Sequence, residues 1–114
     1  MKKFRTLHEF LMEELADQEE AIGYLNVALE EYQQDSDTPF FLKGIKTVVE
    51  AQIGISELAK RTHMSPDALL KVLSSDKAPH VDTLGTILNA LGCRLSIESL
   101  ETENSCSEIT LENN

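Results

Sequence analysis

The sequence predicts an all-α protein with a helix-turn-helix unit near its centre. Aromatic residues make up only 5% of the 114-residue chain and there is no Trp. Leu, Ile, Val and Ala must therefore fill one modest core, which favours helices over a β-sandwich. Apolar residues also recur at helical spacing along most of the chain. In the middle, two short predicted helices are separated by only a few residues, as in a helix-turn-helix.

Two helices are predicted in the acidic N-terminal segment, residues 1–37, and are expected to pack on the core. A capping-box pattern, Asp17 followed three residues later by Glu20, predicts the start of a helix over 18–34. The glutamates of that helix lie outside its apolar stripe, as expected for a solvated surface or one that meets a basic protein. The preceding segment, 5–16, is predicted to form a short amphipathic helix from the spacing of Leu7, Phe10, Leu11 and Leu15.

Residues 38–99 are predicted to form the central unit, beginning with a third helix. Thr38 is the expected N-cap and Pro39 the first helical residue, because proline lacks the N–H that this position leaves unpaired. Gly54 is expected to end this helix or to form the turn that follows it. A later helix over 81–91 is expected to stop at Gly92.

The helix-turn-helix is predicted between these two helices. Residues 55–62 form its first helix, 63–64 the turn, and a second helix runs to Leu73. Ser65 as cap and Pro66 in the first turn mark the start of that second helix. In such a unit the first helix lies across the DNA backbone and the second presents its N-terminal residues to base edges. The outward-facing residues of the second helix are expected to be Pro66, Asp67, Ala68 and Lys71.

The C-terminal region differs from the rest of the chain. Residues 93–98 alternate between apolar and polar side chains, which is typical of a half-buried strand. A lone strand has no partner in a helical chain, so it could pair with the same strand of a second subunit or with another protein's sheet edge. The remaining residues, 100–114, are interpreted as an acidic tail.

The net charge of −10 is unevenly distributed. Residues 1–37 carry ten acidic and three basic residues, whereas residues 55–80 carry four basic and three acidic residues. Contact with phosphates is therefore less unfavourable in the middle of the chain than at its strongly acidic ends. The acidic ends suit contact with a basic protein.

Several functional classes find no support in the sequence. Cys93 and Cys106 form no metal-binding pattern and are expected to be reduced thiols of a cytoplasmic protein. The three histidines are far apart, and no nucleophile triad or phosphate-binding loop is present. We expect no signal peptide, because no apolar stretch follows the basic residues 1–5, and no apolar run reaches membrane-spanning length. We expect no enzymatic activity, no cofactor, no metal and no membrane association.

An ordered series of short motifs extends over about residues 15–98. It comprises Ala21-Ile22-x-Tyr24-Leu25-Asn26, Glu57-Leu58-Ala59-Lys60, Met64-Ser65, Ala68-Leu69, Thr83-Leu84 and Leu88-x-Ala90-Leu91-Gly92-Cys93-Arg94-Leu95-Ser96. This series resembles the lambda-repressor-like (XRE) helix-turn-helix family. Within that family it is most similar to the HigA-like antitoxins, the probable addiction module antidote proteins.

The resemblance implies a lambda-repressor-like bundle that binds operator DNA as a homodimer, represses its own operon and neutralises a basic, RelE-like ribonuclease toxin. Two sets of DNA-binding residues are carried over by position. The recognition face would be Ser65, Pro66, Asp67, Ala68 and Lys71, and the phosphate contacts would be Lys60, Arg61, Thr62, Ser74, Ser75 and Lys77.

The chain departs from the family pattern at two positions. Leu70 stands where the group often has Tyr, and Ala78 where it often has Asn before Pro79. The recognition face also has no Arg, Gln or Asn to read a base with two hydrogen bonds, which leaves Lys71 as the guanine reader. Two alternatives stay open: a stand-alone repressor without a toxin, and a protein-interaction module on a helix-turn-helix scaffold that no longer binds DNA.

Overall fold

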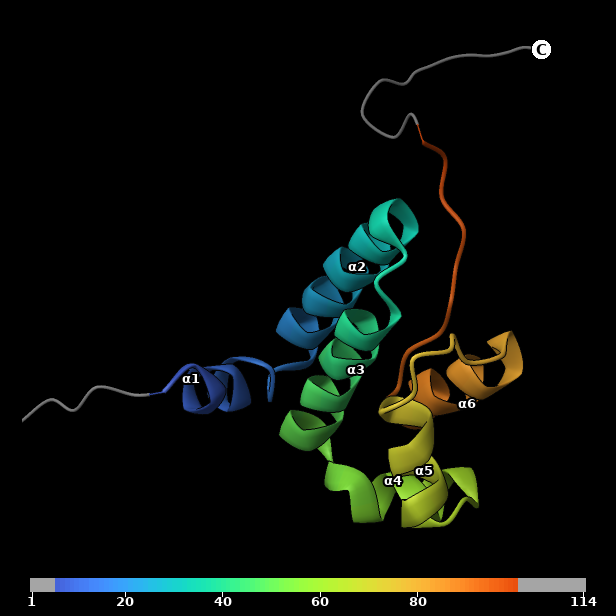
Figure 1. Cartoon of the computed structure of the whole chain (residues 1–114). Coiled ribbons are helices and arrows are strands. Elements are labelled where there is room, and N and C mark those ends of the chain that lie inside the picture. The colour runs from blue at the N-terminus through green and yellow to red at the C-terminus, as the bar shows by residue number, and fades with distance from the viewer. Residues whose placement is uncertain (1–5, 101–114) are drawn as a thin grey trace, which may run out of the picture.

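Helices account for the regular structure of this protein. A computed structural model describes residues 6–100. The helices in that range are α1 (Leu7–Glu14), α2 (Gln18–Asp35), α3 (Thr38–Gln52), α4 (Gly54–Thr62), α5 (Pro66–Leu73) and α6 (Val81–Ala90). Antiparallel α2 and α3 lie side by side, α1 projects to one side, α4 and α5 lie around the C-terminal end of α3, and α6 lies beside α3 on the side opposite α1 (Figure 1). The all-α prediction is confirmed for these residues.

Short polar side chains determine where the long helices begin. Asp17 accepts a hydrogen bond from the backbone N–H of Glu20 at 3.1 Å, as the capping pattern predicts. The predicted cap of α3 was wrong by one residue. Asp37, rather than Thr38, accepts a hydrogen bond from the N–H of Phe40, at 3.2 Å. Thr38 is instead the first helical residue and is buried.

One apolar core contains residues of α2, α3, α4, α5 and α6, together with Leu15 at the end of α1. Leu58 and Leu69 are completely buried at its centre. Burial of such side chains is the main favourable term in the folding of a domain this small. The other members of this core are Leu15, Ala21, Phe41, Leu42, Ile45, Val48, Val49, Ala59, Leu73, Ile87 and Leu91.

The apolar stripe predicted for the first helix is only partly buried. Leu15, just beyond the end of α1, lies in the core, whereas Leu7 is 72% exposed and Phe10 is 43% exposed. The reason is that α1 is short and packs at the edge of the bundle, against α3. Gln52 fixes this end of α1 by donating hydrogen bonds to the carbonyls of Leu15 and Ala16, at 2.7 and 3.1 Å.

Two glycines occupy left-handed backbone positions where helices end. Gly54, the first residue of α4, has φ of +84° where α3 gives way to α4, and Gly92 has φ of +83° after α6. Both fulfil the predicted stop signals, since glycine adopts this conformation without steric cost. The end of α6 is also held from a distance, because Gln18 of α2 donates a hydrogen bond to the carbonyl of Leu91 at 3.3 Å.

The strand predicted at 93–98 does not form within residues 6–100. This segment instead leaves the helical body as an extended trace (Figure 1). Backbone groups of residues 94–98 make no hydrogen bond to any other described residue. A strand requires a second strand to pair with, and the described part of a single chain provides none. The tail predicted at 100–114 lies outside the described residues except for Leu100.

No helix in the described range is both long enough and apolar enough to span a bilayer.

Candidate nucleic-acid interface

A tight turn connects α4 to α5. His63 ends α4 in the left-handed conformation, with φ of 59°. The backbone N–H of Met64 donates to the carbonyl of Ala59 at 3.2 Å, which folds the chain back. Ser65 then caps α5, accepting a hydrogen bond from the N–H of Ala68 at 3.1 Å. The predicted end of α4, the predicted range of α5 and the role of Ser65 as a cap are confirmed, whereas α4 begins at Gly54, one residue earlier than predicted.

Buried side chains hold α5 in one orientation. Leu69 and Leu73 of α5 lie in the same core as Leu58 and Ala59 of α4. Met64 in the turn packs against this core. Because these residues face inward, the opposite side of α5 must face solvent.

The predicted recognition face is on the solvent side. Ser65, Pro66, Asp67 and Lys71 are exposed, and Ala68 is half-buried. Lys71 supplies the positive charge of α5, and Asp67 adds a carboxylate in its first turn. The Ser65 hydroxyl accepts the capping hydrogen bond with one lone pair, so its O–H remains able to donate to a phosphate or a base.

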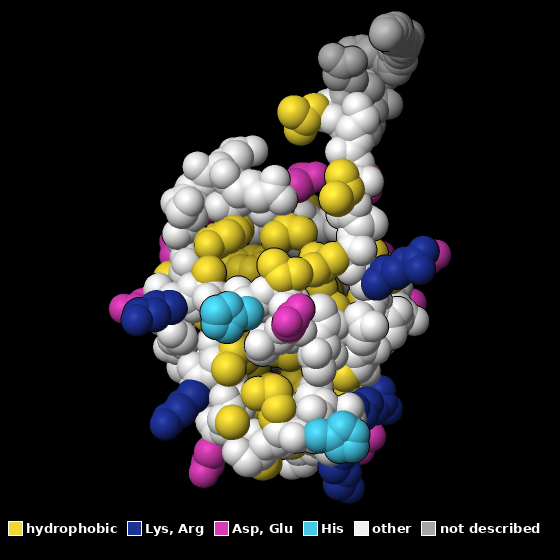
Figure 2. Space-filling model, turned by 90° about the vertical axis from the view of Figure 1, so that its right-hand side faces the viewer, with side chains coloured by type: hydrophobic (Ala, Val, Ile, Leu, Met, Phe, Trp, Pro, Cys, Tyr) yellow, Lys and Arg dark blue, Asp and Glu magenta, His cyan; other side chains and the backbone are white. Residues whose placement is uncertain are grey.

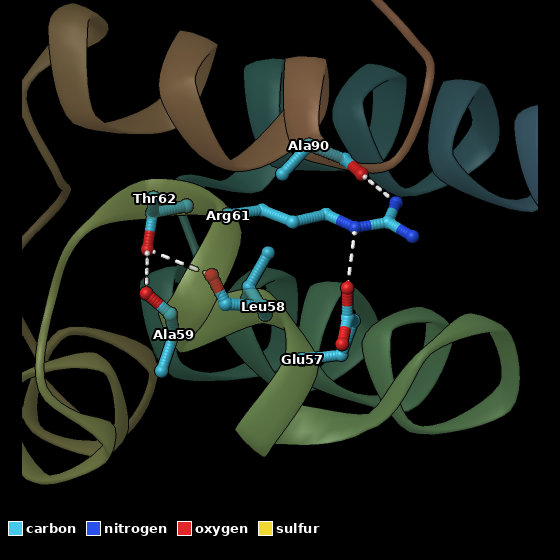
Figure 3. Close-up of polar contacts among 6 residues, drawn as sticks. All are labelled: Glu57, Leu58, Ala59, Arg61, Thr62 and Ala90. Carbon is cyan, nitrogen blue, oxygen red and sulfur yellow. Dashed lines mark hydrogen bonds and ion pairs between the residues drawn. The ribbon is translucent and has the colours of Figure 1, made fainter.

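Arg61 does not extend freely toward solvent as a phosphate contact would require. Its guanidinium Nε lies 3.0 Å from Oε2 of Glu57, one helical turn earlier. A terminal nitrogen donates a hydrogen bond to the carbonyl of Ala90 at 2.9 Å (Figure 3). Arg61 therefore joins α4 to the last turn of α6. The (i, i+4) spacing of Glu57 and Arg61 is visible in the sequence and could have indicated this pairing.

Thr62 is unsuited to the phosphate contact that its position in the sequence suggested. Its side chain is buried, and its hydroxyl donates to the carbonyl of Leu58 at 2.8 Å and lies 3.4 Å from that of Ala59 (Figure 3). A threonine on the inner face of a helix commonly makes this bond to the preceding turn. Thr62 is therefore a core residue and is excluded from the candidate interface.

The loop after α5 brings one further lysine to the surface. Ser74 and Lys77 are exposed, and Ser75 is half-buried. The Ser75 hydroxyl accepts a hydrogen bond from the Lys77 N–H at 2.9 Å and so shapes the loop. The adjacent carboxylate of Asp76 offsets part of the positive charge of Lys77.

Three lysines are thus available for phosphate contact on this part of the molecule: Lys60, Lys71 and Lys77. Each is exposed, and none forms an ion pair with another residue in the range 6–100. On the face drawn in Figure 2, Lys and Arg side chains stand apart around the rim and form no continuous patch. Because these three lysines stand beside the exposed carboxylates of Asp67 and Asp76, the candidate interface is weakly basic, and a single unit should bind DNA weakly.

An apolar groove that no sequence pattern indicated lies beside the C-terminal segment. It has a volume of about 420 Å³ and lies between α2 and α3 on one side and α6 and residues 93–100 on the other. Figure 2 shows apolar side chains gathered in a hollow on this face, next to the emerging segment. Its apolar lining residues are Ile22, Leu25, Leu29, Phe41, Ile45, Leu84, Leu88, Cys93, Leu95 and Leu100. Polar residues also line it, among them Arg94, Ser96 and Glu98 of the C-terminal segment.

No candidate metal-binding site is present in the part of the chain that the structure describes. No three His, Cys, Asp or Glu side chains lie close enough there to hold a metal ion. Cys93 is a free, half-buried thiol, and Cys106 lies outside the described residues.

The fold and its surfaces define a small all-α protein whose candidate interface is a pair of short helices with exposed lysines. Residues 6–99 match the family described as probable addiction module antidote protein. The chain belongs to this family. Membership indicates an antitoxin role and implies a toxin as partner. No curated protein and no solved structure matches the chain.

Proposed function

We propose that this antidote protein is an XRE-type, HigA-like antitoxin with two binding activities. It binds operator DNA through α4, the turn and α5, and represses its own operon as a homodimer. It also binds and silences a basic, RelE-like ribonuclease toxin. In this role it acts by binding alone and catalyses no reaction.

The orientation of α5 is the observation that carries the DNA-binding half. Its inner side is held by Leu69 and Leu73, which leaves the N-terminal residues and Lys71 exposed together. A recognition helix needs this combination, since it must be fixed in the protein and accessible at its N-terminal end. Lys71 then donates to guanine O6 or N7, and Lys60 and Lys77 contact phosphates on either side.

The charge of α2 supports the toxin-binding half. Four glutamates, Glu19, Glu20, Glu30 and Glu31, are exposed on this helix. An acidic surface attracts a basic partner and orients it during encounter. The antidote family supplies the expectation that such a partner exists. A neighbouring gene that encodes a short basic protein would identify it, and co-purification of the two proteins would test their binding.

The DNA-binding half is tested by fluorescence anisotropy with a labelled duplex from the region upstream of the gene, at about 50 and 200 mM salt. We expect sequence-selective binding that weakens steeply with salt. Lys71→Ala should cost about 1–3 kcal/mol and relax the preference at one base pair. Lys60→Ala should weaken binding to all duplexes and lower the salt slope by about one unit.

Lys43→Ala is the matched control for these two variants. Lys43 is also an exposed helical lysine, but it lies on α3, outside the candidate interface. Its removal should change neither the affinity nor the salt slope. An equal loss in all three variants would indicate binding through overall charge and would refute a specific role for α5.

A second candidate function is a protein-interaction module that does not bind DNA. The pairing of Arg61 within the protein favours it, because that leaves few cations on a chain with net charge −10. If the purified protein shows no binding to its upstream duplex at the lower salt concentration, alone or with its toxin, this second function replaces DNA binding.

A further inference from the structure

A second groove, called here the α1–α2 groove, opens between α1 and the first half of α2. It has a volume of about 350 Å³, and its apolar lining residues are Phe10, Leu11, Leu15 and Tyr24. The groove arises because α1 packs against α3 and projects to one side of the α2–α3 pair (Figure 1). This side of α2 is therefore left without a helix that covers it.

Exposed apolar side chains continue the α1–α2 groove along both helices. Leu7 is 72% exposed and lies one helical turn before Phe10, on the same face of α1. Val27 is 52% exposed and lies one helical turn after Gly23, which also lines the groove. Together with the groove these side chains form an exposed apolar patch, as is typical of a surface that binds another protein.

Gly23 keeps the α1–α2 groove open. Glycine within a helix lowers helix stability relative to other residues, so a structural reason for it would be a close neighbour. A Cβ built at Gly23 meets no heavy atom within 4 Å. Packing inside the protein therefore does not explain the glycine, and what its missing side chain provides is free space in the groove.

The surface around the α1–α2 groove is strongly acidic. Residues 6–35 contain nine Asp and Glu residues and neither Lys nor Arg. Glu14 and Glu20 line the groove itself, are exposed, and form no ion pair with another residue in the range 6–100. Carboxylates beside an apolar groove are complementary to a protein whose apolar contact residue is flanked by lysines or arginines.

We propose that the α1–α2 groove is the surface on which the toxin binds, and that it receives an apolar side chain of the toxin flanked by basic residues. This side chain contacts Phe10 and Tyr24, and the flanking cations face Glu14 and Glu20. The inference rests on the proposed function and deepens it, because it assigns the toxin to a specific surface with an apolar centre and a charged rim.

A basic toxin fits the α1–α2 groove better than a second copy of this chain. Two copies that met through this groove would bring two strongly acidic segments together, and like charges oppose that contact. A cation-rich partner is favoured by the same charges, and the antidote family implies a toxin as partner. The groove uses no residue of α4 or α5, so toxin binding there leaves the candidate DNA interface accessible.

The apolar contact is tested with Gly23→Leu, which fills the α1–α2 groove from α2. The probe is the short basic protein encoded by the neighbouring gene, purified and titrated by calorimetry. The substitution should raise its Kd roughly thirtyfold, as exclusion of one central contact residue commonly does. The thermal midpoint of the free protein should not fall, because the new side chain enters open space and leucine is the better helix former.

Gly85→Leu is the matched control for Gly23→Leu. Gly85 is also a helical glycine whose added Cβ would meet nothing within 4 Å, but it lies on α6 and does not line the α1–α2 groove. It should leave the Kd for the toxin unchanged. Gly23→Leu should in turn leave binding of the upstream duplex unchanged. An equal loss of toxin affinity in both variants would contradict a specific role for this groove.

The charged rim is tested by removing its two carboxylates together, with Glu14→Gln and Glu20→Gln. The association rate constant should fall roughly three- to tenfold and depend less on salt, whereas the dissociation rate constant should change less. The control carries Glu50→Gln and Glu98→Gln, which remove the same charge at exposed residues outside the α1–α2 groove. An equal fall in the control would indicate attraction by net charge alone and would contradict the charged rim.

Three results would overturn the assignment of this surface. The first is an unchanged toxin affinity of Gly23→Leu, which would leave the proposed function standing, whereas a wild-type chain that binds no toxin would refute that function itself. The second is a toxin-free dimer, measured by sedimentation, that Gly23→Leu dissociates, since a second copy would then fill the groove. The third is a thermal midpoint that deletion of residues 1–5 lowers in wild type but not in Gly23→Leu, because the chain's own N-terminal residues would then fill it.

Discussion

Replacement of Arg61 by alanine distinguishes a structural role for this residue from the phosphate contact that its position suggests. In the structure Arg61 joins α4 to the end of α6 through Glu57 and the carbonyl of Ala90. We therefore expect Arg61→Ala to lower the free energy of unfolding and to leave the salt dependence of DNA binding unchanged.

The size of the effect follows from the two contacts. The ion pair with Glu57 is about half exposed, with side-chain exposures of 47% and 42%, and such (i, i+4) pairs contribute about 0.3–0.5 kcal/mol. The hydrogen bond to Ala90 has a charged donor but is accessible to water, so we assign it about 1 kcal/mol. Together the loss should be about 1–2 kcal/mol.

Two assays separate the interpretations. Urea denaturation should show a midpoint lowered by about 0.5–1 M, given the usual dependence of unfolding free energy on urea for a chain of this size. The slope of log K against log salt, measured by anisotropy, should stay within error of wild type. Lys60→Ala is the comparator. It should leave the midpoint nearly unchanged and reduce the slope by about 0.9.

The opposite pattern would refute the reasoning. If Arg61→Ala keeps the wild-type urea midpoint but reduces the salt slope as Lys60→Ala does, Arg61 leaves its intramolecular contacts and binds phosphate. Arg61→Lys refines the result. Lysine lacks the forked guanidinium that contacts both acceptors, so this variant should recover only part of the lost stability.

Three further changes test the packing and the backbone. Leu69→Ala removes a fully buried side chain of α5 and should cost about 2–5 kcal/mol in urea denaturation; a loss below 1 kcal/mol would contradict its place in the core. Ser65→Ala removes the cap of α5 and should cost about 1 kcal/mol, whereas Ser65→Asp should keep most of that stability, so equal thermal midpoints for both variants would contradict the cap. Gly92→Ala introduces a Cβ at φ of +83° that would lie 2.9 Å from Nε2 of Gln18 and should cost about 1–2 kcal/mol. Gly85→Ala, in open space within α6, should instead stabilise by up to about 1 kcal/mol, and the two variants should therefore melt on opposite sides of wild type.

Local signals predicted the helices well. Ser65 and Pro66 mark the start of α5, and Gly54 and Gly92 mark helix ends, because caps and left-handed positions depend on a few adjacent residues. The error at the start of α3 shows the limit of such signals. Asp37 and Thr38 are both good caps, and the backbone path decides which carboxylate or hydroxyl reaches a free N–H.

The candidate site was predictable only in part. The solvent-facing side of α5 follows from helical periodicity, and Lys60, Lys71 and Lys77 are exposed as expected. Arg61 and Thr62 could not be placed in the same way. The acceptor of Arg61, the carbonyl of Ala90, is 29 residues away in sequence, and the burial of Thr62 depends on how other helices pack around α4.

The sequence by itself determined the helical class, most helix boundaries and the inward side of α5, because turns, caps and periodicity act over a few residues. Tertiary structure alone decided which apolar residues remain exposed, that Arg61 is used within the protein, and that a groove opens beside residues 93–98. These features arise because segments distant in sequence, such as α2 and α6, come together in space. A local sequence pattern does not predict which distant segments will be neighbours. The alternation at 93–98 is a local signal for a strand, but a strand forms only when a second strand pairs with it. The strand at 93–98 therefore remains a prediction.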